Sequence, residues 1–140
     1  MPEPRFEIFI DGGCSMCSHE SRIMARLDRG RGRLRITDIA SPDFEPPTRT
    51  GTGNDGERLT YEALMRSIHG RYPDGRVVHG VEVFRASYAA VGLGWLWAPT
   101  SWPIVRSIAD RLYRFFAAWR FNRRVRQGCG LSPQHPAPAA

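Results

Sequence analysis

The stretch FEIFIDGGCSMC, residues 6–17, decides the fold predicted for this chain of 140 residues. Its first five residues, Phe6–Ile10, are mostly aromatic or β-branched, a composition typical of a buried β-strand. The Asp-Gly-Gly sequence at 11–13 then marks a tight turn. From Cys14 onward the apolar residues recur at helical spacing. The chain is therefore expected to begin with a strand that passes through a short turn into a helix.

A second strand completes the unit that this stretch begins. The helical spacing continues to Leu27, and Gly30 and Gly32 mark its end. Residues 33–39 carry regularly spaced apolar side chains and stop at the Ser-Pro pair 41–42. A strand, a helix and a strand joined by short connections form a βαβ unit, in which the two strands run parallel and the crossover is right-handed.

The middle of the chain is expected to contain a loop, a short helix and a hairpin. Residues 41–58 are rich in Pro, Gly, Thr and Asp, which favours a surface loop. Thr60 is a candidate N-cap for a short helix, although residues 68–72 fit either the end of that helix or a strand. The Pro-Asp-Gly turn at 73–75 precedes the strand-like residues 76–79, so a β-hairpin is expected there.

Two more helices are expected in the last third of the chain. The first follows Gly80 and stops at Gly92, after which three tryptophans between 95 and 102 are interpreted as packing anchors. The spacing of apolar side chains in residues 103–121 predicts an amphipathic helix that docks on the core. At about 100° per residue, its apolar side chains fall on one face and its arginines on the other. The residues of this expected core-facing stripe are Val105, Ile108, Ala109, Leu112, Phe115, Phe116 and Trp119. The residues of the opposite, solvated arc are Arg106, Asp110, Arg111, Arg114 and Arg120.

The length favours a single domain. We place it at residues 1–127 and interpret the proline-rich residues 128–140 as a disordered tail.

Cys14 and Cys17 carry the strongest chemical signal. A CxxC pair between a strand and a helix of a βαβ unit is typical of a redox site, and positions i and i+3 bring two sulfurs within disulfide reach. The N–H groups and dipole of the first helical turn stabilise a thiolate at Cys14, which lowers its pKa and makes it the nucleophile. Cys17 is then the resolving thiol that attacks the mixed disulfide.

The polar neighbours of the pair allow more than one interpretation. Asp11 is either a proton acceptor for Cys17 or a cap or turn residue at the start of the helix, and it could serve both purposes. His19 and Glu20 are expected to be solvated, although a cationic His19 would lower the pKa of a nearby thiol.

The charge of the chain is concentrated at its C-terminal end. All 20 basic side chains are arginine, so chemistry that needs a lysine amine is excluded. Residues 1–103 carry 13 arginines and 13 acidic residues, whereas residues 104–140 carry seven arginines and only Asp110, which accounts for the net charge of +6. An acidic partner or an anionic membrane surface would suit this segment. No nucleic acid is expected, because the aromatic side chains are assigned to the core.

The run DGGCSMC at 11–17 resembles the signature of the DCC family of thiol-disulfide oxidoreductases, which is named for its Asp-x-x-Cys-x-x-Cys motif. Weaker similarities extend the resemblance over roughly residues 6–125. They are His69, the Asp-Gly pair 74–75, residues 80–84, residues 113–117, Arg120 and Arg123. The resemblance implies a thioredoxin-like fold and dithiol–disulfide exchange, with Cys14 and Cys17 as the redox pair and Asp11 as the acidic residue before them.

We therefore expect an α/β protein: a thioredoxin-like βαβ unit with a β-hairpin and helix, extended by a C-terminal amphipathic helix. Its expected function is exchange with a protein or small-molecule disulfide or dithiol, without organic cofactor or metal. A rival interpretation is a non-enzymatic interaction module that binds through the basic helix. A third is a zinc-stabilised domain, for which Cys129, His19 and His135 are the remaining donors. Cys129 is otherwise interpreted as an incidental thiol, and His69 as a structural or surface histidine.

The sequence also suggests a compartment. The first residues lack the basic and apolar regions of a signal peptide, and no stretch reaches the ~18 apolar residues of a membrane-spanning helix. Three cysteines are too few for a disulfide scaffold. A cytoplasmic location is predicted.

Overall fold

Strand β1 (Phe6–Ile10) is at the centre of the fold. The computed structural model describes residues 3–48 and 58–126. In it β1 pairs in parallel with β2 (Leu34–Asp38), in a register that places Phe6 opposite Leu34, and helix α1 (Ser15–Asp28) connects the two strands. The predicted βαβ unit is therefore confirmed. Helix α1 ends where Arg29 takes a left-handed conformation, at φ 52°, just before Gly30 at φ 70°.

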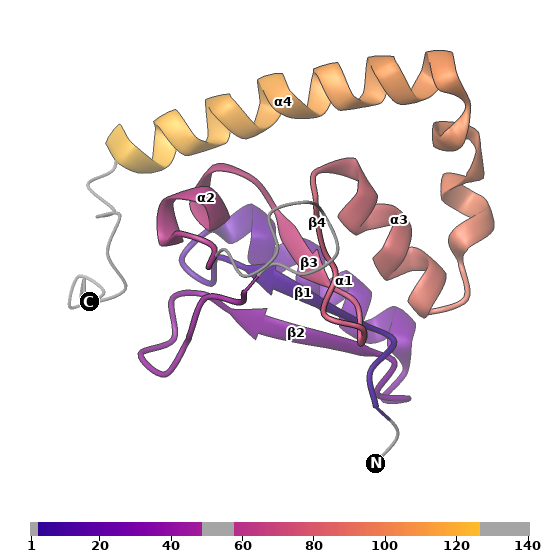
Figure 1. The fold of residues 1–140 in the computed structure, drawn as a ribbon, viewed down its shortest axis with the longest axis horizontal. Coiled ribbons are helices and arrows are strands. Elements are labelled where there is room, and N and C mark those ends of the chain that lie inside the picture. The colour runs from indigo at the N-terminus through magenta and orange to yellow at the C-terminus, as the bar shows by residue number, and fades with distance from the viewer. Residues whose placement is uncertain (1–2, 49–57, 127–140) are drawn as a thin grey trace.

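On its other side β1 pairs with the predicted hairpin. Strand β3 (His69–Arg71) runs antiparallel to β1, and β4 (Val77–His79) runs antiparallel to β3. The sheet order is β2-β1-β3-β4 (Figure 1). Residues 68–72, which fitted either a helix or a strand, thus contain a strand. The short helix before them is α2 (Tyr61–Arg66), and its N-cap Thr60 accepts a hydrogen bond from the N–H of Ala63 at 3.2 Å.

Each face of the sheet packs against its own apolar core. The buried side chains of Phe6 and Ile8 join Met24 of α1 and Val83 of α3 (Val81–Ala90). Phe9 points to the opposite face, where a second core lies next to α2. That second core consists of Phe9, Ile39, Leu59, Leu64, Met65 and Val77. The result is a mixed α/β fold that is compatible with the expected thioredoxin-like class.

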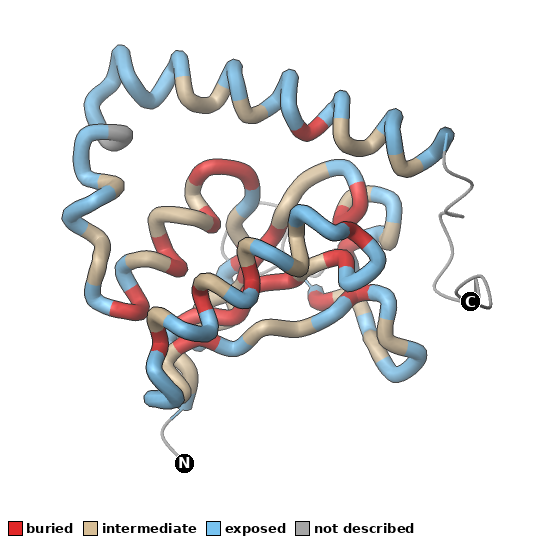
Figure 2. Tube along the Cα trace, turned by 180° about the vertical axis from the view of Figure 1, so that it is seen from behind, coloured by how far each residue is buried: buried red, intermediate tan, exposed pale blue. Residues whose placement is uncertain are grey.

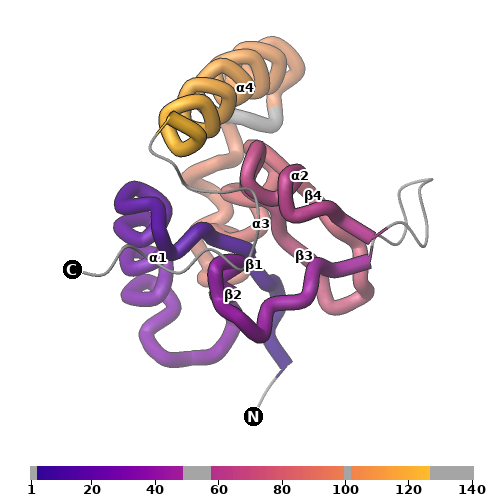
Figure 3. The backbone as a smooth tube through the Cα atoms, turned by 90° about the vertical axis from the view of Figure 1, so that its left-hand side faces the viewer, coloured from indigo at the N-terminus to yellow at the C-terminus, as the bar shows by residue number. Residues whose placement is uncertain are grey.

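A long helix crosses one end of this body. After α3 a 3-10 helical segment, η1 (Gly94–Ser101), leads into α4 (Pro103–Arg126). Figures 1 and 3 show α4 lying across the molecule above α2 and α3. The helix was expected to end near residue 121 because the apolar pattern fails there, but it continues to Arg126. Apolar periodicity marks a docking face, whereas a helix can continue wherever its backbone hydrogen bonds do.

The orientation predicted for α4 is wrong. Its apolar stripe was expected to face the core, yet Ile108, Leu112 and Phe115 are exposed. Within the helix only Ala117 is buried (Figure 2). The face that meets the body is instead formed by polar, aromatic and small side chains, namely Tyr113, Ala117, Arg120, Phe121 and Arg124. The physical reason is that this face makes specific contacts with the segments around Cys14 and Cys17.

Parts of the sequence predictions remain predictions. The expected loop 41–58 falls partly, and the expected tail 128–140 wholly, outside the described residues. The division into one domain and a tail is likewise still a prediction. Among the described helices, none combines the length and apolar character that crossing a membrane requires.

Candidate functional site

Cys14 is the residue at which the turn after β1 becomes helix α1. It occupies the N-cap position with an extended backbone, φ −96° and ψ 113°, and no side chain caps the helix there. The backbone N–H of Cys14 donates to the carbonyl of Asp11 at 3.0 Å, which closes the turn. Cys17 follows in the first helical turn, and both thiols are free. The turn therefore places the Cys14 sulfur where the unpaired N–H groups of the helix point.

The pKa values of the two thiols are shifted in opposite directions. A hydrogen bond from the Cys17 thiol is the largest cause that lowers the pKa of Cys14, from 9.0 to about 5. Burial opposes this shift, while the backbone N–H groups of Cys17 and Met16 and the charge of Arg120 add to it. The same hydrogen bond, followed by burial, raises the pKa of Cys17 far above its ordinary range. At neutral pH the pair therefore holds one thiolate, on Cys14, and one proton, on Cys17.

A side chain from α4 touches the second sulfur. The Nη1 atom of Arg120 donates to Sγ of Cys17 at 2.8 Å, and its Nη2 atom donates to the carbonyl of Met65 in α2 at 3.0 Å. The charge of Arg120 lowers the pKa of Cys17, against the larger effects that raise it. Arg120 was predicted to lie on the solvated arc of the helix, and this prediction is wrong.

Asp11 is paired with a second arginine of α4. Its side chain is almost fully buried, and its Oδ2 atom lies 3.0 Å from Nη2 of Arg124. Its Oδ1 atom accepts from the N–H of Gly13 at 3.0 Å, while Nη1 of Arg124 donates to the carbonyl of Gly13 at 2.9 Å. Asp11 is thus a turn residue, not the N-cap of α1. Among the described contacts, those of Cys17 are with Cys14 and Arg120, not with Asp11.

The absence of a side chain at Gly13 leaves room for the guanidinium of Arg124. A Cβ atom on Gly13 would lie 2.6 Å from Nη2 of Arg124, which is shorter than any normal contact. With a side chain at position 13, the guanidinium of Arg124 would have to shift from its contacts with the turn that carries Cys14.

Tyr113 fixes the middle of α4 to the segment between α2 and β3. Its hydroxyl oxygen accepts from the N–H of Ile68 at 2.9 Å and lies 3.4 Å from Oγ of Ser67. Burial raises the pKa of Tyr113 above 10.0, so the hydroxyl stays protonated. Tyr113, Arg120 and Arg124 thus lie on one face of the helix, and each holds a different segment of the site.

A largely apolar cavity of about 360 Å³ opens beside Cys17. Aromatic side chains from three elements surround it, and the rings of Phe84 and Trp97 are stacked with centroids 5.6 Å apart. The lining residues are Ile8, Ile10, Met16, Cys17, Glu20, Ser21, Ile68, Phe84, Trp97, Tyr113, Phe116 and Arg120. The cavity therefore places a largely apolar surface, which also includes the guanidinium-bearing Arg120, next to Cys17.

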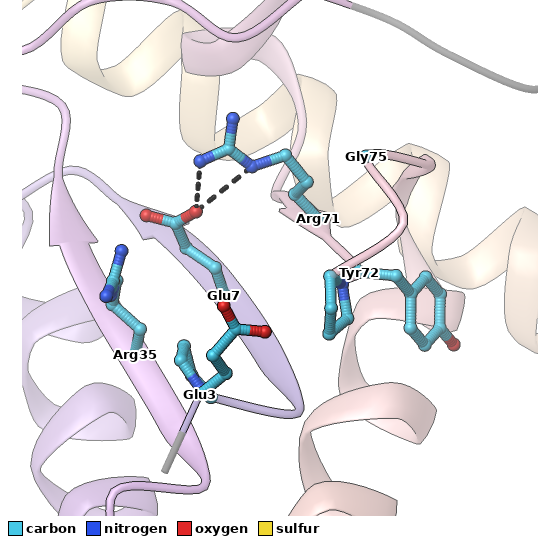
Figure 4. A pocket seen from close by; sticks show the side chains of 8 residues that line it. Glu3, Glu7, Arg35, Arg71, Tyr72 and Gly75 are labelled. Carbon is cyan, nitrogen blue, oxygen red and sulfur yellow. Dashed lines mark hydrogen bonds and ion pairs between the residues drawn. The ribbon is translucent and has the colours of Figure 1, made fainter. Parts of the chain in front are cut away.

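A second cavity, of about 260 Å³, involves the beginning of β1 and lies away from the thiols. Figure 4 shows its charged side chains. Oε2 of Glu7 accepts from both Nε and Nη2 of Arg71, at 3.1 and 2.6 Å, and Oε1 accepts from Thr37 at 2.7 Å. Because the Glu7 carboxylate is satisfied within the sheet, we assign it a structural role.

The remaining polar residues singled out in the sequence are His19, Glu20, His69, Cys129 and His135. His19 is exposed, and Glu20 accepts from the Tyr88 hydroxyl at 3.4 Å. His69 is buried in β3, with Nδ1 2.8 Å from the carbonyl of Ser67. Within residues 3–48 and 58–126, no group of three or more His, Cys, Asp and Glu side chains could hold a metal ion. Cys129 and His135, which the zinc interpretation needs, lie outside the described residues.

Sequence reasoning missed the arginines of this site. Arg124 was considered only as part of the basic helix that would bind a partner, and Arg120 was placed on the solvated arc and noted as a point of family similarity. The sequence did contain a signal that places them on one face. Arg120 lies about two helical turns after Tyr113, and Arg124 lies about two turns after Ala117. The stronger apolar signal on the opposite face of α4 concealed it.

Comparison with known proteins places the chain in a redox context. A model of the family described as DCC1-like thiol-disulfide oxidoreductase matches residues 8–126. The chain is also 33% identical, over 124 residues, to a protein of Arabidopsis thaliana named as uncharacterized and chloroplastic. That alignment covers 86% of this chain and 55% of the relative, so the chain spans about half the length of the relative. No solved structure matches.

Proposed function

The chain belongs to the DCC1-like thiol-disulfide oxidoreductase family, and from this premise we propose that it exchanges the dithiol of Cys14 and Cys17 with disulfides. One observation carries the proposal. The pKa of Cys14 is lowered to about 5 while that of Cys17 is raised, and Arg120 contacts the Cys17 sulfur. A nucleophilic thiolate beside a protonated thiol is the arrangement that such exchange needs.

The first step is attack by the Cys14 thiolate on a partner disulfide. A bond forms between Sγ of Cys14 and one partner sulfur, and the partner's S–S bond breaks. The other partner sulfur leaves as a thiolate and takes a proton from water. The exposed backbone of Gly12 and Gly13 leaves room for the partner on one side of Cys14, whose own surface is only 7% exposed.

The second step is resolution by Cys17. Its thiol loses a proton to solvent, and the resulting thiolate attacks Sγ of Cys14. The bond between Cys14 and the partner breaks, and the second partner sulfur is released. Two electrons have then passed from the dithiol to the partner, and the same steps run backwards oxidise a partner dithiol. Arg120 contributes by stabilising the negative charge that forms on Cys17.

Asp11 takes part by positioning. Through Arg124 and Gly13 it joins the end of α4 to the turn that carries Cys14. This arrangement favours the turn interpretation of Asp11, and a role as proton acceptor for Cys17 stays a prediction.

The cavity beside Cys17 indicates which partners suit the site. Its lining is mostly apolar and includes Phe84, Trp97 and Phe116. A substrate with an apolar group next to its sulfur would bury that group there. The cytoplasmic location expected from the sequence also stays a prediction.

Trapping the mixed disulfide tests this function. Replacing Cys17 by Ser stops the second step, so Cys17→Ser should accumulate a covalent adduct with a peptide disulfide through Cys14. The matched variant Cys14→Ser should form none. Equal adduct formation by both variants, or none by either, would contradict the proposed roles.

A further inference from the structure

The outward face of α4 exposes large apolar side chains that the contacts of the thiol site do not explain. Ile104 is 76% exposed and Phe115 77% exposed, although both are large apolar side chains. They form part of an apolar stripe along the helix. We use the name outward stripe for its residues, which are Ile104, Ile108, Leu112, Phe115 and Trp119. Soluble proteins rarely expose so long an apolar surface unless it binds something.

Segment η1 and the residue after it carry further exposed apolar side chains. Trp95 is 72% exposed and Trp102 is 69% exposed, and Leu96 between them is exposed as well. Tryptophan favours the boundary between water and hydrocarbon, because its ring is apolar and its N–H is polar. The described structure thus places exposed tryptophans at one end of an exposed apolar helix.

Arginines border the outward stripe on both sides. At about 100° per residue, Arg111 and Arg114 flank it on one side and Arg123 flanks it on the other. All three are exposed. Arg126 lies beyond the last residue of the stripe and is exposed too. The one acidic residue of the helix, Asp110, faces Arg106 at 3.9 Å.

The arrangement of apolar and basic side chains on α4 indicates which kind of partner fits its outward face. A second copy of the chain would bring two sets of flanking arginines together, at a cost in electrostatic repulsion. A bilayer that contains anionic lipids offers both an apolar interior for the stripe and negative headgroups for the arginines. We propose that α4 binds the surface of anionic membranes through its outward stripe, lying in the plane of the headgroups.

The proposal is independent of the redox chemistry. Arg120 and Arg124 point to the opposite side of α4, where they hold Cys17 and Asp11. Binding through the outward stripe therefore leaves the contacts with the thiol pair in place. Membrane binding can fail while thiol exchange stands, and the reverse also holds.

The test is flotation of the full chain with lipid vesicles. The protein should float with vesicles of phosphatidylcholine and phosphatidylglycerol but not with phosphatidylcholine alone, and added salt should weaken the binding. The double variant Leu112→Ser/Phe115→Ser should lose at least tenfold in affinity, since it removes two large apolar side chains that would be buried in the bilayer. Tryptophan emission should shift to the blue on binding.

Charge variants separate the electrostatic contribution to membrane binding from the apolar contribution. Arg111→Gln/Arg114→Gln should weaken binding to anionic vesicles roughly tenfold, whereas Arg31→Gln, at an exposed position far from α4 in the sequence, should change it little. Absence of flotation at low salt would overturn the proposal. So would a dimer in solution that Leu112→Ser/Phe115→Ser dissociates, because the outward stripe would then be an interface between copies.

Discussion

Arg120 donates from Nη1 to Sγ of Cys17 at 2.8 Å, although the two residues are 103 positions apart in the chain. The contact joins the last helix to the N-terminal motif. Since Arg124 contacts Asp11 one turn further on, α4 is part of the thiol site. The roles of these contacts can be tested separately.

The pKa of Cys14 depends first on Cys17. We expect the alkylation rate of Cys14 to rise with pH through an inflection near pH 5, because only the thiolate reacts. Cys17→Ala removes the largest lowering contribution, so the inflection should move up by about one to two pH units. The control Ser15→Ala changes an exposed residue of the same turn and should leave the inflection in place. Iodoacetamide labelling followed by mass spectrometry measures both, and an inflection near pH 9 in the wild type would contradict the structure.

Arg120 should control the resolution step. Arg120→Met removes the charged donor to Cys17, so attack by Cys17 on the mixed disulfide should slow by roughly ten- to a hundredfold. Arg120→Lys should recover part of the rate. Stopped-flow release of a fluorescent thiol from the Cys14 adduct measures it. Arg114→Met, on an exposed part of the same helix, is the matched control, and an equal effect of both substitutions would exclude a specific role for Arg120.

The pair of Asp11 and Arg124 should be strongly coupled in stability. Arg124→Met leaves a buried carboxylate without its partner, and we expect a loss of about 3 kcal/mol or more in the free energy of unfolding. Asp11→Asn/Arg124→Met should lose much less than the sum of its single variants. Urea denaturation of the four proteins measures the coupling. The coupling energy of the exposed pair of Arg106 and Asp110 on the same helix should be under about 1 kcal/mol. Equal coupling energies in the two pairs would be evidence against a special structural role of the pair of Asp11 and Arg124.

The cavity beside Cys17 should select apolar partners. Trp97→Ala enlarges it and removes an apolar wall, so kcat/KM should fall roughly tenfold for a peptide disulfide with Leu or Phe next to the cysteine. The rate with glutathione disulfide should change little. Trp95→Ala removes a neighbouring tryptophan that is exposed, and it serves as the control. A uniform loss with both substrates would mean that the cavity does not bind the partner.

Local signals in the sequence were sufficient to predict the βαβ unit and the hairpin. Strand β1, the Asp-Gly-Gly turn and Cys14 lie within a few residues of each other, and their chemistry depends mainly on the first turn of α1. Likewise, the Asp74-Gly75 turn determines how β3 meets β4. Each of these predictions rested on residues that lie close together in the sequence.

The packing of α4 could not be predicted in this way. Amphipathic periodicity selects the most apolar face, but α4 docks through Ala117 and through polar contacts made by Tyr113 and Arg120. Specific bonds to distant segments decided the orientation. The prediction that the tryptophans are packing anchors was limited in the same way. Trp97 stacks on Phe84, as expected of an anchor, while Trp95 and Trp102 are exposed.

Equilibration in glutathione redox buffers, followed by thiol alkylation and mass measurement, tests the central claim most directly. We predict a single two-electron transition confined to Cys14 and Cys17. Its potential should lie on the oxidising side of thioredoxin's value of about −270 mV, because the lowered pKa of Cys14 stabilises the reduced form. A pair that stays reduced in every buffer, or a transition that involves Cys129 in place of Cys17, would contradict the account.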